Sequence, residues 1–208
     1  MINNPVSQAI KGVICFGVLL MGAMGCCCAQ GVPAQGAPEQ GVPEAAKKAA
    51  AAATKLLGDQ VLRTNYSYVI QRMYPRHKAR AAKKAGGEAK LAEQLATLSE
   101  KMKSQGIVIL TFAVGEPKSA FLVPEYKEWL VFVPTKKVYT LPDPQRGNAY
   151  RKIESYGYQV AVAKEGGQDW YFMDGSNLTV QQLRSMFPSL PKDVKLLSLP
   201  RVEQKEIK

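Results

Sequence analysis

The spacing of apolar residues changes once along the chain, close to Gly106. Before that point apolar residues repeat at helical intervals, and the clearest stripe is Leu91, Leu95, Leu98 and Met102. After it the period becomes two, and β-branched and aromatic residues dominate, which is typical of strands. The pattern therefore predicts three or four helices followed by a sheet.

Glycine and proline mark where the predicted helices begin and end. Gly58 is expected to end a first helix that is rich in alanine and lysine, and Asp59 is expected to cap the second. Pro75 should break or restart that second helix. The pair Gly86-Gly87 should then separate it from the helix that carries the apolar stripe.

Strands joined by short turns follow, which favours an antiparallel sheet. The expected strands are 107–114, 120–124, 128–133, 137–141, 149–163 and 170–173. A capping box at Thr179 and Gln182 predicts a short last helix. Its inward-facing residues are expected to be Leu183, Met186 and Phe187. The fold class is therefore α+β, with N-terminal helices packed on one face of a strongly curved antiparallel sheet.

The beginning of the chain carries a predicted export signal. Lys11 precedes the apolar run 12–21, which has the length of a secretory signal core and is too short to span a bilayer as a helix. The segment Ala23-Met24-Gly25-Cys26 resembles a bacterial lipobox, so Cys26 is a candidate for lipid attachment. Ordinary cleavage after Ala29 is the alternative.

These features predict four parts. Residues 1–28 are the signal peptide, and 29–43 form a linker rich in glutamine, glycine and proline with a five-residue repeat. A single domain is predicted over 44–191, and 192–208 form a polar, loosely held tail. The predicted location is the periplasm, or the outer side of a membrane to which only a lipid anchor attaches the protein.

Composition excludes several kinds of chemistry for the mature domain. The four cysteines all lie in the export segment, at Cys15, Cys26, Cys27 and Cys28. Thiol catalysis, cysteine-bound zinc and iron–sulfur clusters are therefore excluded after cleavage. His77 is the single histidine, so a histidine-rich metal site is not expected, and no cofactor is predicted. The net charge of +11 favours anionic partners, but export makes nucleic acid an unlikely target.

Several short segments occur together in one known group of proteins. They are Met-Tyr-Pro at 73–75, Gly-Gly at 86–87, Met-Lys-Ser-Gln-Gly-Ile at 102–107 and Glu-Gly-Gly-Gln-Asp-Trp-Tyr-Phe-Met-Asp-Gly at 165–175. Through them the chain from Ala45 to Pro191 resembles the secreted bacterial members of the nuclear-transport-factor-2-like, or SnoaL-like, superfamily. The resemblance implies a cone-shaped α+β barrel with an internal cavity, and a possible homodimer.

The resemblance implies no single activity, because the superfamily includes isomerases, dehydratases and transport adaptors. Its enzymatic members place a histidine or an acid dyad inside the cone. Here His77 falls in a basic helical stretch and not on a strand, which argues against catalysis.

The first group of candidate site residues lies on the predicted strands. Alternation along 149–163 puts Glu154, Tyr156 and Tyr158 on one face, where they line a pocket if that face is concave. The alternative is that both tyrosines pack beneath the helices. Asp174 is the fourth pocket candidate. It is five residues from Asp169, so the two carboxylates are expected on opposite faces of a strand and do not form a catalytic pair.

The second group is a basic stripe on a helix. Arg72, Arg76, Arg80 and Lys83 follow one another at intervals of four, four and three residues. Such a stripe is a candidate anion-binding surface for phosphates or anionic glycans, or it is an ordinary solvated helix face.

Three functions are compatible with these observations. The first is a non-enzymatic envelope protein whose conical domain binds a small molecule or a partner protein. The second is a pocket enzyme of the SnoaL type that uses Glu154 or Asp174 with the tyrosines. The third is a structural adaptor whose basic helix binds an anionic surface polymer.

Overall fold

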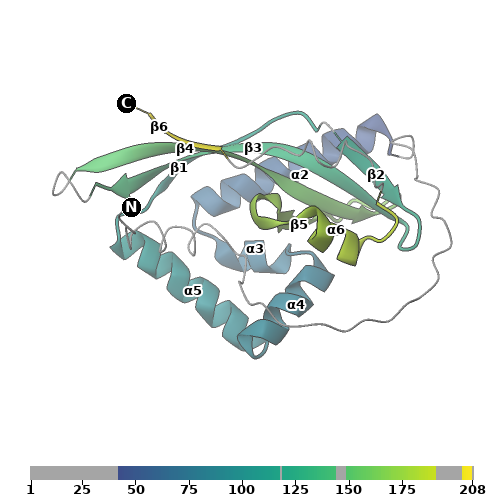
Figure 1. The fold of residues 1–208 in the computed structure, drawn as a ribbon, viewed down its shortest axis with the longest axis horizontal. Helices are drawn as coiled ribbons and strands as arrows, with labels where there is room; N and C mark the ends of the chain where they lie inside the picture. Colours follow the sequence, from purple (N-terminus) through teal and green to yellow (C-terminus); the bar gives the residue numbers. More distant parts are fainter. Residues whose placement is uncertain (1–41, 118, 144–148, 191–202, 208) are drawn as a thin grey trace.

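The computed structural model describes residues 42–117, 119–143, 149–190 and 203–207. Within these residues, four α-helices precede the first strand and one more follows β5 (Tyr171–Asp174) (Figure 1). They are α2 (Glu44–Leu62), α3 (Tyr66–Gln71), α4 (Pro75–Ala85), α5 (Glu88–Ser104) and α6 (Val180–Met186). None of the helices in this part of the chain is long and apolar enough to cross a membrane. The predicted export segment, with Cys26, and nearly all of the predicted linker lie outside the described residues.

A long hairpin forms the centre of the sheet. Its strands β3 (Glu128–Pro142) and β4 (Tyr150–Lys164) pair along their whole length. The other strands are β1 (Ile109–Val114), β2 (Ser119–Val123), β5 (Tyr171–Asp174) and β6 (Glu203–Ile207). β1 and β2 lie end to end along the outer edge of β3, and β5 and β6 do the same along β4. The α+β class and the antiparallel sheet are therefore confirmed, and the sheet is open, since β1 does not pair with β5.

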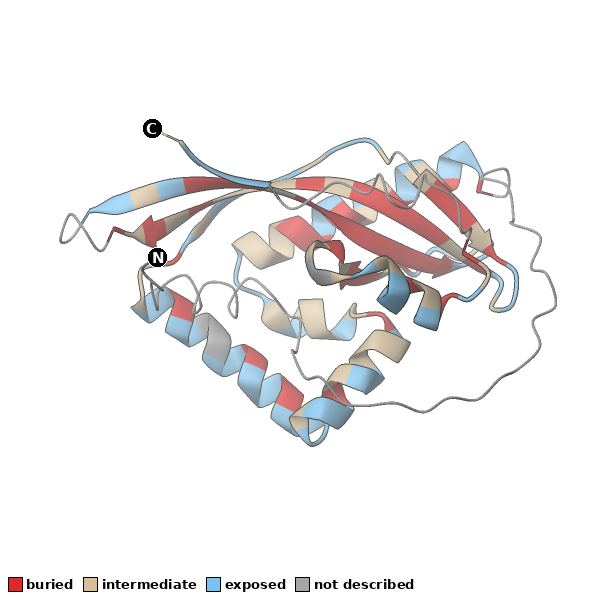
Figure 2. Ribbon diagram, in the orientation of Figure 1, coloured by how far each residue is buried: buried red, intermediate tan, exposed pale blue. Residues whose placement is uncertain are grey.

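The two faces of this sheet bury different partners, because side chains alternate along each strand. Odd-numbered residues of the hairpin, such as Val131 and Ala161, pack against α2. Even-numbered residues, such as Phe132 and Val160, pack against α6 and its C-terminal Phe187. Figure 2 shows that buried residues follow β3 and β4 between these two layers.

Gly58 does not end the first helix as predicted, because α2 continues to Leu62. A Cβ atom at position 58 would lie only 2.2 Å from the ring of Phe112 on β1. The glycine therefore allows α2 to approach the sheet closely. The prediction that Asp59 caps the next helix is also wrong, since the side chain of Asn65 accepts the capping hydrogen bond of α3.

The other predicted helix boundaries are confirmed. Pro75 occupies the first turn of α4, and Gly86 ends that helix in the left-handed conformation, with φ at 87°. Leu91, Leu95 and Met102 are buried on α5, whereas the side chain of Leu98 lies outside the described part. The capping box of α6 is present, with Thr179 and Gln182 bonded reciprocally, and Leu183, Met186 and Phe187 are buried.

The predicted strands 128–133 and 137–141 form the single strand β3, because Pro134 does not interrupt it. The carbonyl of Pro134 accepts a hydrogen bond from the N–H of Gly115, at 2.9 Å. Its ring nitrogen therefore also faces the connection between β1 and β2, where the missing N–H interrupts no strand pairing.

The sequence predicted a loosely held C-terminal tail, but part of the tail is paired with the sheet. Its residues Glu203–Ile207 form β6 and pair with β4 opposite Lys152–Tyr156. Ion pairs support this pairing: Lys205 Nζ lies 3.2 Å from Glu154 Oε1, and Arg151 Nη1 lies 3.5 Å from Glu206 Oε2.

Candidate functional site

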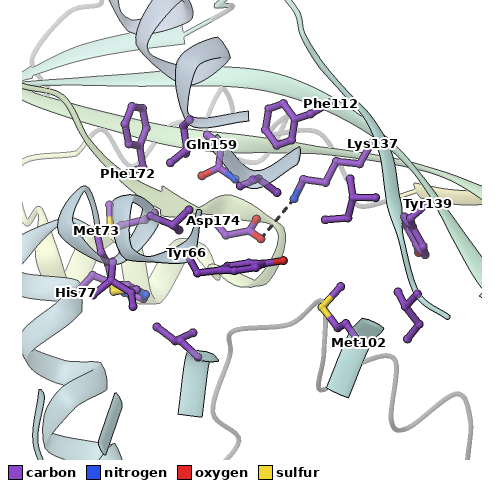
Figure 3. A pocket seen from close by; sticks show the side chains of 18 residues that line it. Tyr66, Met73, His77, Met102, Phe112, Lys137, Tyr139, Gln159, Phe172 and Asp174 are labelled. Carbon is purple, nitrogen blue, oxygen red and sulfur yellow. Dashed lines mark ion pairs between the residues drawn. The ribbon is translucent and has the colours of Figure 1, made fainter. Parts of the chain in front are cut away.

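A cavity of about 200 Å³ lies between the α2-facing side of the sheet and the helices (Figure 3). Helices α2 to α5 supply one wall, and β1, β3, β4 and β5 supply the other. Twelve of its eighteen lining residues are apolar. They are Leu57, Val61, Val69, Ile70, Met73, Leu95, Met102, Ile107, Ile109, Phe112, Phe172 and Met173. An apolar wall with few polar groups is the usual character of a small-molecule site.

Among the described residues, Asp174 is the only acidic one in this wall, and β5 places it there. It pairs with Gln159 of β4, so it shares the cavity-facing side of the sheet. One carboxylate oxygen, Oδ1, accepts a hydrogen bond from the N–H of Ser176 at 3.0 Å. The next residue is Gly175, where a Cβ atom would lie 2.0 Å from the ring of Tyr158. The Asp-Gly pair thus combines a turn with a carboxylate that borders the cavity.

Lys137 extends from β3 toward Asp174, as Figure 3 shows. Its Nζ lies 3.7 Å from Asp174 Oδ2, which is an ion pair without a hydrogen bond. The ammonium also lies 5.6 Å from the ring centroid of Phe112, within the range of a cation–π contact. The side chain of Lys137 is only 18% exposed, so this charge is largely removed from bulk water.

His77 also lines the cavity, although the sequence placed it away from any pocket. Burial lowers its pKa, and the neighbouring Arg80 and Lys84 lower it further, while Asp174 acts in the opposite direction. The imidazole is therefore neutral near pH 7. Ile70 lies on α3, Met73 between the two helices and His77 on α4, so no single helical repeat in the sequence joins the histidine to the apolar wall.

Of the four predicted pocket residues, only Asp174 lines this cavity. Tyr158 is 4% exposed and lies in the core between the sheet and α6. Burial raises its pKa to about 12, and the charge of Asp174 contributes to that shift. Even-numbered positions of β4 face α6, whereas the cavity borders the odd-numbered ones, which is why the predicted set is divided.

Glu154 and Tyr156 form a separate cluster with two lysines. Lys136 and Lys205 both pair with the carboxylate of Glu154, which also accepts the hydrogen bond of the Tyr156 hydroxyl. Lys136, followed by Tyr156, lowers the pKa of Glu154 to about 2. All of its acceptor groups are thus engaged within the protein.

The predicted basic stripe is not one row on one helix. Arg72 lies before α4 and pairs with the exposed Asp169 at 3.0 Å. Arg76 stacks on Tyr126, with its guanidinium carbon 3.2 Å from the ring centroid. Arg80 donates hydrogen bonds to the hydroxyl and carbonyl oxygens of Ser185 at the end of α6. Lys83 is exposed near the end of α4. Three of the four cations therefore contact other parts of the protein.

No group of three or more histidine, cysteine, aspartate or glutamate side chains is arranged to hold a metal ion in the described part of the chain. Comparison with protein-family models, with curated proteins and with solved structures finds no match for this chain.

Proposed function

We propose that this protein binds a small molecule, with an apolar body, in the cavity between its sheet and its N-terminal helices. The observation that carries the proposal is the cavity itself, which combines an apolar wall with one ion pair, Lys137–Asp174. An apolar wall favours an apolar ligand because binding removes apolar surface from water. The ion pair gives the site one polar point at which a ligand can be oriented.

The size of the cavity limits the ligand. A dry apolar cavity of about 150 Å³ in another protein holds benzene. The present cavity, at about 200 Å³, suits a molecule with one ring or a short chain. Benzyl alcohol is therefore a suitable neutral probe.

We also propose that the protein is exported and that its domain has the nuclear-transport-factor-2-like architecture. The predicted signal peptide and the lipobox-like segment at Cys26 support an exported protein of the cell envelope. Helices that precede a bent antiparallel sheet, with a cavity between them, support the nuclear-transport-factor-2-like cone as the family architecture. The anionic-polymer alternative has less support, because Arg72, Arg76 and Arg80 already have partners.

Filling the cavity tests the proposal. Val69→Phe places a larger side chain in the wall, whereas Val108→Phe makes the same change at a site that is 49% exposed. We expect Val69→Phe to weaken the binding of benzyl alcohol roughly tenfold, because the ring takes up the space of the ligand. The control should bind as the wild type does. Calorimetric titration of the purified full-length protein measures both, and equal affinities in the two variants would refute a ligand site at this place.

A second candidate function is supported by His77. A neutral imidazole and a carboxylate, Asp174, border the same apolar cavity, which is a combination that can move a proton in a bound ligand. If the protein is such a pocket enzyme, it should accelerate hydrogen exchange at a carbon atom of its ligand in D₂O. His77→Gln should abolish the acceleration. A simple binder shows no exchange.

A further inference from the structure

Lys137 lacks a hydrogen-bond acceptor within the described residues, although its charge is largely buried. An ammonium group has three donors. In the described part of the chain, the ion pair that Lys137 makes is with Asp174 Oδ2, which lies 3.7 Å away, beyond hydrogen-bonding distance. Its second contact, the ring of Phe112, satisfies charge but accepts no conventional hydrogen bond. Without a protein acceptor, the ammonium keeps its donors for water or for a ligand that enters the cavity.

Asp174 is better satisfied than its partner. The N–H of Ser176 fixes one carboxylate oxygen from within the turn that follows β5. The other oxygen, Oδ2, is the one that faces the ammonium, at 3.7 Å. A group that enters the cavity can therefore reach the donors of Lys137 without displacing Asp174.

The charge around the cavity favours an anion. The whole chain carries a net charge of +11, and Asp174 is the only acidic side chain that the described part of the chain contributes to the cavity wall. Arg80 and Lys84 lie on α4 with the cavity-lining His77, and after burial their positive charges lower its pKa further. A positive potential attracts small anions and raises their local concentration.

We infer that the ligand is a small organic anion, with an apolar body of about one ring and a carboxylate that accepts hydrogen bonds from Lys137. The inference rests on the proposed function, since it names the chemical class that the same cavity takes. Tyr66 also lines the cavity, and its hydroxyl can supply a further donor for a bound carboxylate. The aliphatic walls then receive the ring.

Benzoate and benzyl alcohol separate this inference from the proposed function, because they have the same ring and differ in charge. The titrations use the full-length wild type, Lys137→Met and the control Lys55→Met, in which an exposed lysine of α2 is changed in the same way. Wild type and Lys55→Met are expected to bind benzoate about tenfold more tightly than benzyl alcohol, the size of one charge-assisted hydrogen bond. Lys137→Met should lose this preference and still bind benzyl alcohol.

Each other outcome has a definite meaning. Equal binding of the two probes by the wild type overturns the inference and leaves the cavity as a site for neutral ligands. A preference for benzoate that survives in Lys137→Met also overturns it, because another group then holds the anion. Failure of both probes to bind refutes the proposed function itself. If Lys137→Met loses its circular dichroism spectrum, Lys137→Gln replaces it.

Discussion

The two faces of the sheet can be compared through one carboxylate on each, Glu154 of β4 and Asp174 of β5, whose surroundings differ sharply. On one face, Glu154 contacts Lys136, Lys205 and the hydroxyl of Tyr156. On the other, Asp174 faces Lys137 across 3.7 Å and borders a cavity. A fully satisfied polar cluster stabilises one arrangement of the chain. The Lys137–Asp174 pair borders the cavity and leaves hydrogen-bond donors of Lys137 for a ligand.

Apolar side chains also pack more completely on the Glu154 face of the sheet than on the Asp174 face. Tyr158, Phe132 and Phe187 fill the space between the sheet and α6, with ring centroids of Phe132 and Tyr158 5.9 Å apart. On the opposite face, Phe112 packs against α2 at Gly58 but also borders the cavity. One face is therefore full and the other is partly hollow.

Matched truncations test this difference and should give the largest effect. Phe187→Ala empties a site of zero exposure and is expected to lower the free energy of unfolding by about 3–5 kcal/mol. Phe112→Ala makes the same change at a half-buried ring that already borders empty space, so its loss should be about half as large. Urea unfolding of both variants provides the comparison. A larger loss for Phe112→Ala would contradict the view that the α6 face is the fuller one.

Neutralising Asp174 should have an intermediate effect, and it should strengthen the binding of benzoate. Asp174→Asn can still accept the hydrogen bond from Ser176 through its side-chain oxygen. It removes the competing negative charge near Lys137, so benzoate affinity should rise roughly 3- to 10-fold. Benzyl alcohol, titrated in parallel, should change little. A weaker affinity for benzoate would mean that Asp174 itself contributes to holding the ligand.

Glu154→Gln on the satisfied face should have the smallest effect, and one that depends on pH. The folded-state pKa of Glu154, about 2, is below its ordinary value of 4.5. The stability that its ion pairs contribute is therefore fully present above about pH 4.5 and is lost as the pH falls toward 2. The urea midpoint of Glu154→Gln should lie below that of the wild type at pH 6, and the two should converge near pH 2. A constant difference across this range would show that the lysine contacts do not stabilise the fold.

Local sequence signals identified much of this fold. The capping box at Thr179, the restart at Pro75 and the stop at Gly86 act within a few residues, so one sequence is enough to reveal them. Gly58 and Pro134 were misjudged for the opposite reason. Gly58 is explained by its contact with Phe112, and Pro134 by its position beside the connection between β1 and β2. Both contacts join residues that are distant in the sequence.

The site was predicted less well, because alternation assigns residues to faces without showing which face is hollow. Lys136 and Lys137 are adjacent and chemically identical, yet one joins the Glu154 cluster and the other reaches the cavity. The register of β3 on β4 and the position of α2 decide this, and neither is written in the local pattern. Asp174 was identified because it flanks the aromatic run Trp170-Tyr171-Phe172, which is visible in the sequence.

The most direct test of the account is a crystal structure of the protein with 4-bromobenzoate. The account predicts a bromine anomalous peak inside the cavity, with the ligand carboxylate within hydrogen-bonding distance, about 3 Å, of Lys137 Nζ. A cavity closed by side chains, or a ligand bound in it with its carboxylate directed away from Lys137, would contradict it.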